Sequence, residues 1–301
     1  MNTKYMMKKQ RYWLLCLIGM VCFSSCNNEN EEQNFGDNLS MNLMAQVNKV
    51  KSRASSDNSW IADGTEQISL NVGEKKVTFK VVDVDGTLEP VNEDNQLYWP
   101  TPLKPQMVTA WYPATEGNNL PVTWDVQADQ SGTGFQQSDI LYTSTEVSFQ
   151  GNKILPFEHL TTKVIVNLKG NGKNDADLTG AVGTIENSVL TGNFSEGILT
   201  ASSGVGQTII PQKFMSTDEY AFSCQALLVP QDMKEKQFIK IQMTGRTFYY
   251  VPEEGDANLV GGYKSVYNIT VGDQKIFVEV EKNSAQWGNE EDEIVETTPI
   301  S

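Results

Sequence analysis

The feature that most limits the fold of this chain is a series of short segments in which every second residue is apolar. Residues 76–81, 162–168 and 220–228 follow this pattern, which is the repeat of a β-strand with one buried face. Turn-forming stretches at 83–86 and 244–245 separate such segments. Since no convincing helical repeat occurs after residue 50, the sequence predicts an all-β chain with two successive β-sandwiches.

Two groups of expected strands define the domain limits. Prolines between 100 and 113 confine the strands of the first group to sheet edges or short pieces. A second group starts near Leu155, so we expect β-sandwiches at 54–155 and 156–287, followed by an acidic tail at 288–301. Further strands are expected at 107–112, 121–126, 140–149, 238–243, 247–251, 267–271 and 276–280.

The first 25 residues have the layout of a secretory signal peptide. Lys8, Lys9 and Arg11 precede an apolar run at 12–23, and small residues follow it. The run is too short for a membrane-spanning helix, which needs about 20 residues. We therefore expect residues 1–25 to direct export. Translation can begin at one of three methionines: Met1, Met6 or Met7.

Cys26 follows two serines at the end of this signal. The Ser24-Ser25-Cys26 sequence is similar to a bacterial lipobox, in which the cysteine becomes the lipid-modified first residue. Three acyl chains, at about 0.8 kcal/mol per buried CH₂, would hold the protein at a membrane surface. An ordinary signal peptide with an incidental cysteine is the alternative. The polar stretch at 27–32 is then a tether or a signal for surface export.

Residues 39–50 allow two interpretations. The alternation of side chains predicts a strand with one buried face. The positions on that face are Leu39, Met41, Leu43, Ala45 and Val47. The same segment also fits an apolar helical face, with Asp37 or Asn38 as its cap. Periodicity alone does not choose between a strand and a helix.

The stretch that follows, at 49–58, is polar, small and basic before it becomes turn-forming. Loops of this composition are preferred sites of proteolytic nicking. Two arginines remain after the signal, Arg53 and Arg246, and Arg246 falls in the hairpin expected around 244–245. Arg53 is therefore the arginine expected in an open loop.

The net charge argues against nucleic acid as a partner. All 38 acidic residues follow the signal, but only 19 of the 23 basic residues do, which leaves a net charge of −19 after Cys26. Nucleic acid or an anionic lipid surface would repel such a protein. The same charge keeps the chain soluble and disfavours casual self-association.

The sequence holds no recognisable constellation for catalysis, so we expect neither an enzyme nor a cofactor or metal site. His159 is the single histidine, which is too little for a catalytic triad or a histidine-based metal site. The stretches at 83–86 and 174–177 lack the ligand pattern of a calcium-binding loop and are better explained as turns. Cys224 is expected to be a small buried residue without a disulfide partner.

Several motifs follow one another in an order that resembles the fimbrillin family of Bacteroides and its relatives. The lipobox at Cys26 comes first, and the Ser52-Arg53-Ala54 junction follows. The motifs of the expected sandwiches lie at 97–100, 110–113, 139–142, 156–166, 261–264, 267–271 and 286–287. The order of these motifs over nearly the whole chain carries the resemblance.

The resemblance implies a structural subunit of a bacterial surface pilus, with two transthyretin-like β-sandwiches. The precursor would reach the cell outer membrane as a lipoprotein modified at Cys26. An arginine-specific protease would then cut between Arg53 and Ala54 and release the segment 26–53 with its strand. The opened groove would accept a strand from another fimbrial subunit. Donor strands of this family usually come from the C-terminal segment, here 288–301.

Some alternatives stay open at the level of sequence. The subunit could belong to the stalk or the tip of a pilus, or be an accessory subunit, and its adhesive ligand is not specified. A monomeric lipid-anchored adhesin or glycan-binding lipoprotein would present Trp60, Trp99, Trp111 and Trp124 as an exposed platform. Such aromatic residues are more often core residues in a β-rich chain, so we expect them to be buried.

Overall fold

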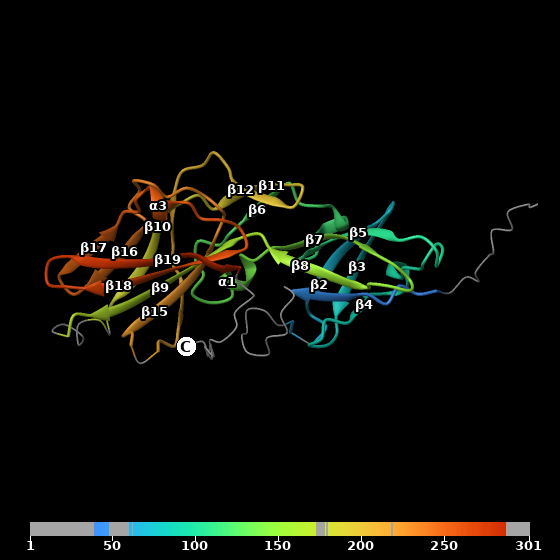
Figure 1. The fold of residues 1–301 in the computed structure, drawn as a ribbon, viewed down its shortest axis with the longest axis horizontal. Coiled ribbons are helices and arrows are strands. Elements are labelled where there is room, and N and C mark those ends of the chain that lie inside the picture. The colour runs from blue at the N-terminus through green and yellow to red at the C-terminus, as the bar shows by residue number, and fades with distance from the viewer. Residues whose placement is uncertain are drawn as a thin grey trace, which may run out of the picture. The chain divides into compact units, whose positions relative to one another are not determined.

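The computed structural model describes residues 39–47, 60–61, 63–172, 178, 180–217 and 219–286. Cys26, Arg53, Ala54 and the segment 288–301 lie outside the described residues. Within the described ranges, no helix is long and apolar enough to cross a membrane. Strands make up most of the ordered structure (Figure 1), and the prediction of an all-β sandwich fold is confirmed.

The first sheet has seven strands in the order β1-β8-β7-β5-β2-β3-β4. Their bounds are β1 (Met44–Val47), β2 (Gln67–Val72), β3 (Lys75–Val81), β4 (Leu88–Pro90), β5 (Gln106–Tyr112), β7 (Leu141–Val147) and β8 (Ile154–His159). Neighbouring strands are antiparallel except for β1 and β8, which are parallel. The alternation predicted at 76–81 appears in β3, where Val77, Phe79 and Val81 are buried.

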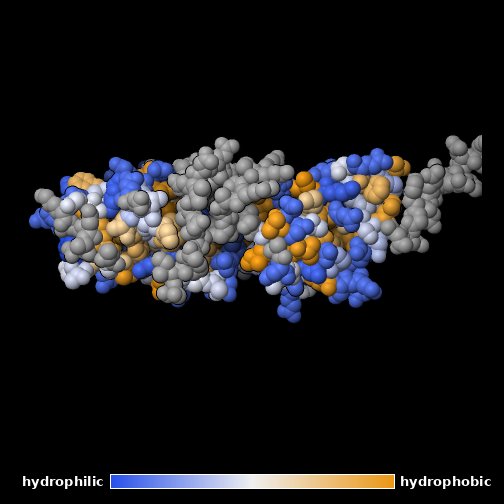
Figure 2. Space-filling view, turned by 90° about the horizontal axis from the view of Figure 1, so that it is seen from below, coloured by the Kyte–Doolittle hydropathy of each residue, from blue (hydrophilic) through white to orange (hydrophobic). Residues whose placement is uncertain are grey.

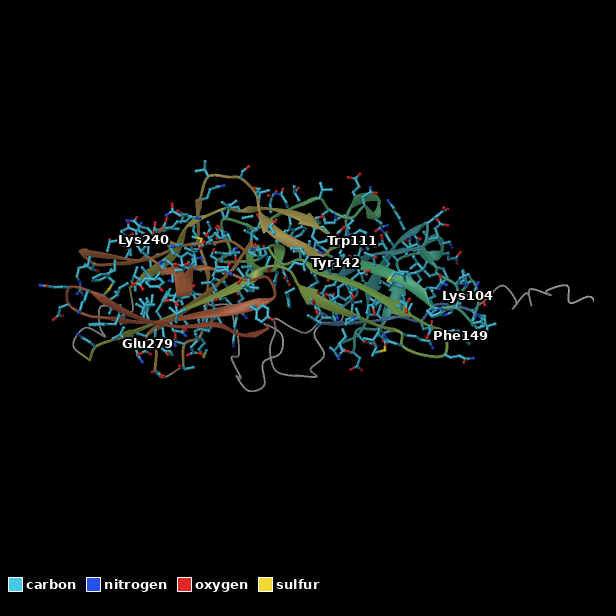
Figure 3. The ribbon with its side chains drawn as sticks, turned by 45° about the horizontal axis from the view of Figure 1, so that its top comes forward. Lys104, Trp111, Tyr142, Phe149, Lys240 and Glu279 are labelled. Atoms are coloured by element: carbon cyan, nitrogen blue, oxygen red, sulfur yellow. The ribbon has the colours of Figure 1, made fainter. Side chains whose placement is uncertain are left out.

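One face of this sheet builds a cluster of buried apolar residues that we call the first core. It includes Phe79, Ala110, Leu155 and Phe157. Trp111 follows Ala110 on β5 and therefore points to the opposite face, where its indole Nε1 donates to Thr115 Oγ1 at 3.1 Å. Figure 3 labels Trp111 with Tyr142, the residue opposite it on β7.

Three further sheets surround a second core. Their strand orders are β14-β15-β9-β18-β19, β13-β10-β16-β17 and β12-β11-β6. The bounds are β6 (Thr123–Asp125), β9 (Thr162–Gly170), β10 (Val182–Ser188), β11 (Thr191–Ser195), β12 (Ile198–Ala201), β13 (Gln207–Ile209), β14 (Gln212–Phe214), β15 (Phe222–Leu228), β16 (Ile239–Met243), β17 (Arg246–Tyr250), β18 (Tyr263–Val271) and β19 (Ile276–Gln286). Phe238 and Tyr267 are among the residues of the second core. The hairpin predicted around 244–245 is confirmed by the pairing of β16 with β17.

Strand β15 differs from the one-faced strand predicted at 220–228, because all 7 of its residues are buried. Cys224, Ala226 and Leu228 contribute to the second core. On the other face, Leu227 clusters with Phe135. The side-chain amide of Gln130 also accepts a hydrogen bond from Leu227 N–H and donates one to Leu227 O, each at 2.8 Å. Residues distant in sequence therefore cover this second face of β15. The alternation of side chains within β15 does not predict that covering.

Two features of the fold are not visible in the sequence pattern. The short helices α1 (Gly134–Gln137) and α3 (Glu254–Ala257) have 4 residues each, which is too few to carry a helical repeat. The junction expected at 155/156 lies inside β8, and Val126 and Ile140, which precede it, pack in the second core. The domain limits stay a prediction. We describe regions of the protein by the core, first or second, to which their residues belong.

Candidate functional site: the strand that closes the first sheet

Residues 39–47 lie between two edges of the first sheet. On one side β1, drawn in blue beside β8 in Figure 1, pairs with β8 from Met44 opposite Ile154 onward. On the other side the segment forms isolated bridges to Thr87, just before β4, and to Tyr98. The segment thereby connects the β8 edge to the β4 end and closes the sheet.

The backbone of this closing segment bonds to both sides. Bonds from odd-numbered residues reach the 86–99 stretch: Trp99 N–H to Leu39 O (2.8 Å), Met41 N–H to Leu97 O (2.9 Å), Leu88 N–H to Leu43 O (3.1 Å) and Ala45 N–H to Gly86 O (2.7 Å). Met44, an even-numbered residue, donates its N–H to Lys153 O at 3.0 Å, on the β8 side. Removing the segment would therefore expose unpaired backbone groups along two edges at once.

The side chains of the closing segment alternate between the first core and the surface. Met41, Leu43, Ala45 and Val47 are buried in the first core, whereas Met44 is exposed. This is period two, so the strand interpretation of 39–47 is confirmed and the helical one is wrong for these residues. Burial of Met41, Leu43 and Val47 contributes about 5–9 kcal/mol, as an upper estimate from the typical value for one apolar side chain.

Trp60 and Gly86 hold the closing segment at Ala45. The indole Nε1 of Trp60 donates to Ala45 O at 3.0 Å, and its ring packs edge-on against Tyr112 and Phe157, with centroid distances of 5.6 and 5.9 Å. Gly86 has a φ of +85°, and a Cβ there would lie 1.8 Å from Ala45 O. Only glycine permits both this backbone conformation and this approach.

Glu66 fixes the chain immediately after Trp60. Its Oε2 accepts a hydrogen bond from Ile61 N–H at 2.5 Å. Burial of the carboxyl group raises the pKa of Glu66 to about 7, and the repulsion from Asp63 adds to this, while the bond from Ile61 opposes it. A half-buried carboxyl group is therefore part of the support of the Trp60 region.

The tryptophans do not form an exposed platform. Trp60, Trp99 and Trp111 are buried, and Trp124 is half-buried, with its Nε1 donating to Ser138 O at 2.9 Å. The platform required by the glycan-binding alternative is thus wrong, and the expectation of core residues holds for the first three. On the face drawn in Figure 2, hydrophilic residues are spread between groups of apolar ones.

The other residues considered for chemistry, His159 and Cys224, are both buried. His159 is buried, and its Nδ1 lies 2.9 Å from Asp139 Oδ1. Cys224 is buried in the second core, and burial raises the pKa of its thiol to about 12, which makes it unreactive. These two residues serve packing and hydrogen bonding in the regions around them.

The stretch at 83–86 forms the turn that the sequence predicts. Asp83 Oδ1 accepts a hydrogen bond from Thr87 N–H at 2.9 Å, and Asp83 O accepts one from Gly86 N–H at 3.1 Å. Among the described residues, no group of three or more His, Cys, Asp or Glu side chains could hold a metal ion. The stretch at 174–177 lies outside the described residues.

Sequence reasoning finds part of this site. The structure brings Met41, Leu43, Ala45 and Val47 into the first core as expected, with Leu39 packed partly against it, while Arg53 and Ala54 lie outside the described residues. The roles of Gly86 and Trp60 are missed, because both act on Ala45 across a long sequence distance. The glycine at the end of the 83–86 turn is the signal that could have pointed to a close backbone approach.

Two crystal structures share this fold. One, a candidate cell adhesion protein from Bacteroides uniformis ATCC 8492, has a TM-score of 0.61 and 20% identity, and the match covers 80% of this chain and 96% of that one. The other, a candidate cell adhesion protein from Bacteroides ovatus ATCC 8483, has a TM-score of 0.63 and 19% identity over 82% and 98% of the two chains. No curated protein matches the chain. The fold thus defines an all-β sandwich protein of the kind seen in these bacteria.

The sequence profile of the family described as fimbrillin-like matches residues 48–287. The protein therefore belongs to the fimbrillin-like family, and the resemblance seen in the sequence is confirmed. Membership supports a fimbrial or adhesive role at the cell surface, in association with other fimbrial subunits. Neither the family nor the two structures are described as enzymes.

Proposed function

We propose that this protein is a structural subunit of a bacterial surface fimbria, matured by proteolysis and assembled by strand exchange. The observation that carries the proposal is the closing segment 39–47, which is bonded along both of its edges and buries four side chains in the first core. A strand held through backbone bonds and alternate side chains is replaceable by another strand that offers the same groups.

The cut that we propose, between Arg53 and Ala54, falls in the stretch that joins β1 to Trp60. After the cut, non-covalent contacts alone would hold the closing segment. The released fragment would also carry Cys26 and its lipid, so the same cut would free the subunit from the outer membrane. One proteolytic event would then couple maturation to detachment.

Cutting alone would not empty the groove. An intact linker keeps the closing segment at an effective concentration in the millimolar range, and the cut removes this advantage. The fragment would keep its buried side chains and backbone bonds, so it would leave slowly in the absence of a competitor. A strand from another fimbrial subunit would therefore displace the bound fragment rather than enter an empty groove. Direct displacement also avoids an open strand edge, which is prone to unspecific association.

The proposal is tested by cutting the non-lipidated chain. Residues 27–301 are treated with an arginine-specific protease, and the products are followed by N-terminal sequencing and by a denaturing gel run without boiling. The expected result is a new N-terminus at Ala54, and a ladder of oligomers would show that a second copy of this chain supplies the donor strand. An Arg53→Lys variant keeps the charge and is the matched control, since it should stay uncut and monomeric.

The other outcomes separate the alternatives. A cut at Arg53 without a ladder would indicate that the donor strand belongs to a different subunit, or that this subunit lies at a tip. A stable monomer with no cut at Arg53 would sink the strand-exchange proposal. That result would favour a lipid-anchored monomeric adhesin.

A further inference from the structure

Ala45 has the smallest of the side chains that the closing segment 39–47 places in the first core, and it is 0% exposed. On the β8 side it lies opposite Leu155, which is also fully buried. On the other side its N–H bonds to Gly86 O at 2.7 Å. The neighbouring core positions of the segment, Leu43 and Val47, hold larger apolar side chains.

The backbone at Ala45 is fixed as well as the side chain. A Cβ at Gly86 would lie 1.8 Å from Ala45 O and 2.9 Å from Ala45 C. Trp60 holds the same carbonyl oxygen, and the ring of Trp60 is itself packed against Phe157. A larger side chain at position 45 would have to push the strand outward, and the contacts with Gly86 and Trp60 oppose that movement.

We infer that the groove of the first core accepts a strand with the pattern apolar–x–apolar–x–small–x–apolar, in which glycine, alanine or serine takes the place of Ala45. The inference deepens the proposed function and rests on it, because it specifies the strand that replaces residues 39–47. Overpacking of a closed core position is destabilising, so the groove discriminates between strands by the size of this one side chain.

The pattern also identifies the kind of partner. In the segment 288–301, no run of alternate positions reads as two apolar residues followed by a small one. The run that begins at Ile294, for example, places Glu296 at the second core position. The partner is therefore a different polypeptide whose strand carries the pattern, rather than the 288–301 segment of a second copy of this chain.

The first test uses the full uncut chain. Ala45→Leu adds a large side chain inside the groove, whereas Met44→Leu places the same leucine at an exposed neighbour with little change in volume. We expect Ala45→Leu to lower the midpoint of thermal unfolding by about 3–10 °C, and Met44→Leu to leave it within about 1 °C. An Ala45→Leu protein that melts like the wild type overturns the inference.

The second test offers strands to the cut protein. Labelled peptides carry residues 39–50 in the natural sequence, with Leu at the position of Ala45, or with Leu at the position of Met44, and a fourth peptide carries 288–301. We expect equal binding of the natural and Met44→Leu peptides. The Ala45→Leu peptide should bind at least about tenfold more weakly, and the 288–301 peptide should not compete. Equal binding of the Ala45→Leu peptide overturns the inference while strand exchange still holds.

A further outcome tests the requirement for a small residue at position 45 separately from strand exchange. If no peptide enters the cut protein but Ala45→Leu still destabilises the uncut chain as expected, the requirement for a small residue holds for the closing segment. Strand exchange, and with it the proposed function, is then rejected.

Discussion

The two cores of this protein are completed in different ways. The second core is lined by β9, β15 and β18, each of which has a partner strand on both sides within one sheet. The first core is closed by the segment 39–47, which joins the remaining sheet through residues 48–59. One cut in that connection would leave four buried side chains of the first core, and none of the second, on a segment held by non-covalent contacts alone. In the proposed strand exchange, the first core is therefore the part of the fold that opens, and the second is the part that stays intact.

The largest effect that tests this comparison lies in the second core. Phe238 is fully buried and packs edge-on against Tyr267 at a centroid distance of 5.6 Å. We expect Phe238→Ala to cost about 3–5 kcal/mol of unfolding free energy, measured by urea unfolding, because it leaves a cavity. Phe277→Ala removes the same ring at a position that is 54% exposed and should cost less than about 0.5 kcal/mol.

Hydrogen exchange extends this experiment to the closing segment. If the cores are stabilised separately, Phe238→Ala should weaken the protection of amides in β9 and β15 and leave that of Met41 and Ala45 nearly unchanged. An equal loss of protection in both places would contradict the comparison. The two cores would then unfold as one cooperative unit.

The next effect concerns the contact between Gly86 and Ala45 of the closing segment. Gly86→Ala combines a positive φ with a clash against Ala45 O, whereas Gly73→Ala has a positive φ of 59° with nothing within 4 Å of the added Cβ. We expect Gly73→Ala to cost about 1 kcal/mol and Gly86→Ala about 3 kcal/mol. Urea unfolding measures both. Equal costs would show that the close approach at Ala45 relaxes easily.

The fold of the first core is only partly predictable from the sequence. The alternation at 39–47 correctly gives the buried positions Met41, Leu43, Ala45 and Val47, because period two is a local property of a strand. It does not say that the strand lies between β8 and the 86–99 stretch, since those partners are distant in sequence and are chosen by tertiary packing. Gly86 illustrates the limit, because the sequence shows a turn glycine but not the carbonyl that approaches it.

The second core is also only partly predictable from the sequence. The face of β15 that carries Cys224 and Leu228 is evident from the alternation, whereas the burial of Leu227 depends on Gln130, which comes from a loop 97 residues away. Local periodicity therefore predicts which residues face a core. It cannot predict what covers the opposite face.

A smaller effect concerns the hydrogen bond at the end of the closing segment. Trp60→Phe keeps an aromatic ring but removes the bond to Ala45 O, and Trp124→Phe removes the equivalent bond to Ser138 O. Each change should cost about 0.5–1.5 kcal/mol. We expect the Trp60 change alone to speed the release of a labelled 39–53 fragment after cutting, followed by fluorescence. Equal release from both variants would show that Trp60 does not hold the strand.

The smallest effect is the pH dependence that Glu66 gives to the region around Trp60. Its pKa is raised from a usual value of 4.5 to about 7 by burial, so the folded chain keeps a proton that the unfolded chain loses between these values. The stability contributed by this proton is present at pH 4.5 and is lost as the pH rises to about 7. Between pH 5 and 8, the unfolding midpoint of the wild type should fall about 2–4 °C more than that of Glu66→Gln, which cannot titrate. Glu74→Gln, at an exposed turn residue, should follow the wild type. Parallel curves for the wild type and Glu66→Gln would mean that water reaches this carboxylate, and that the support of Trp60 does not depend on its charge.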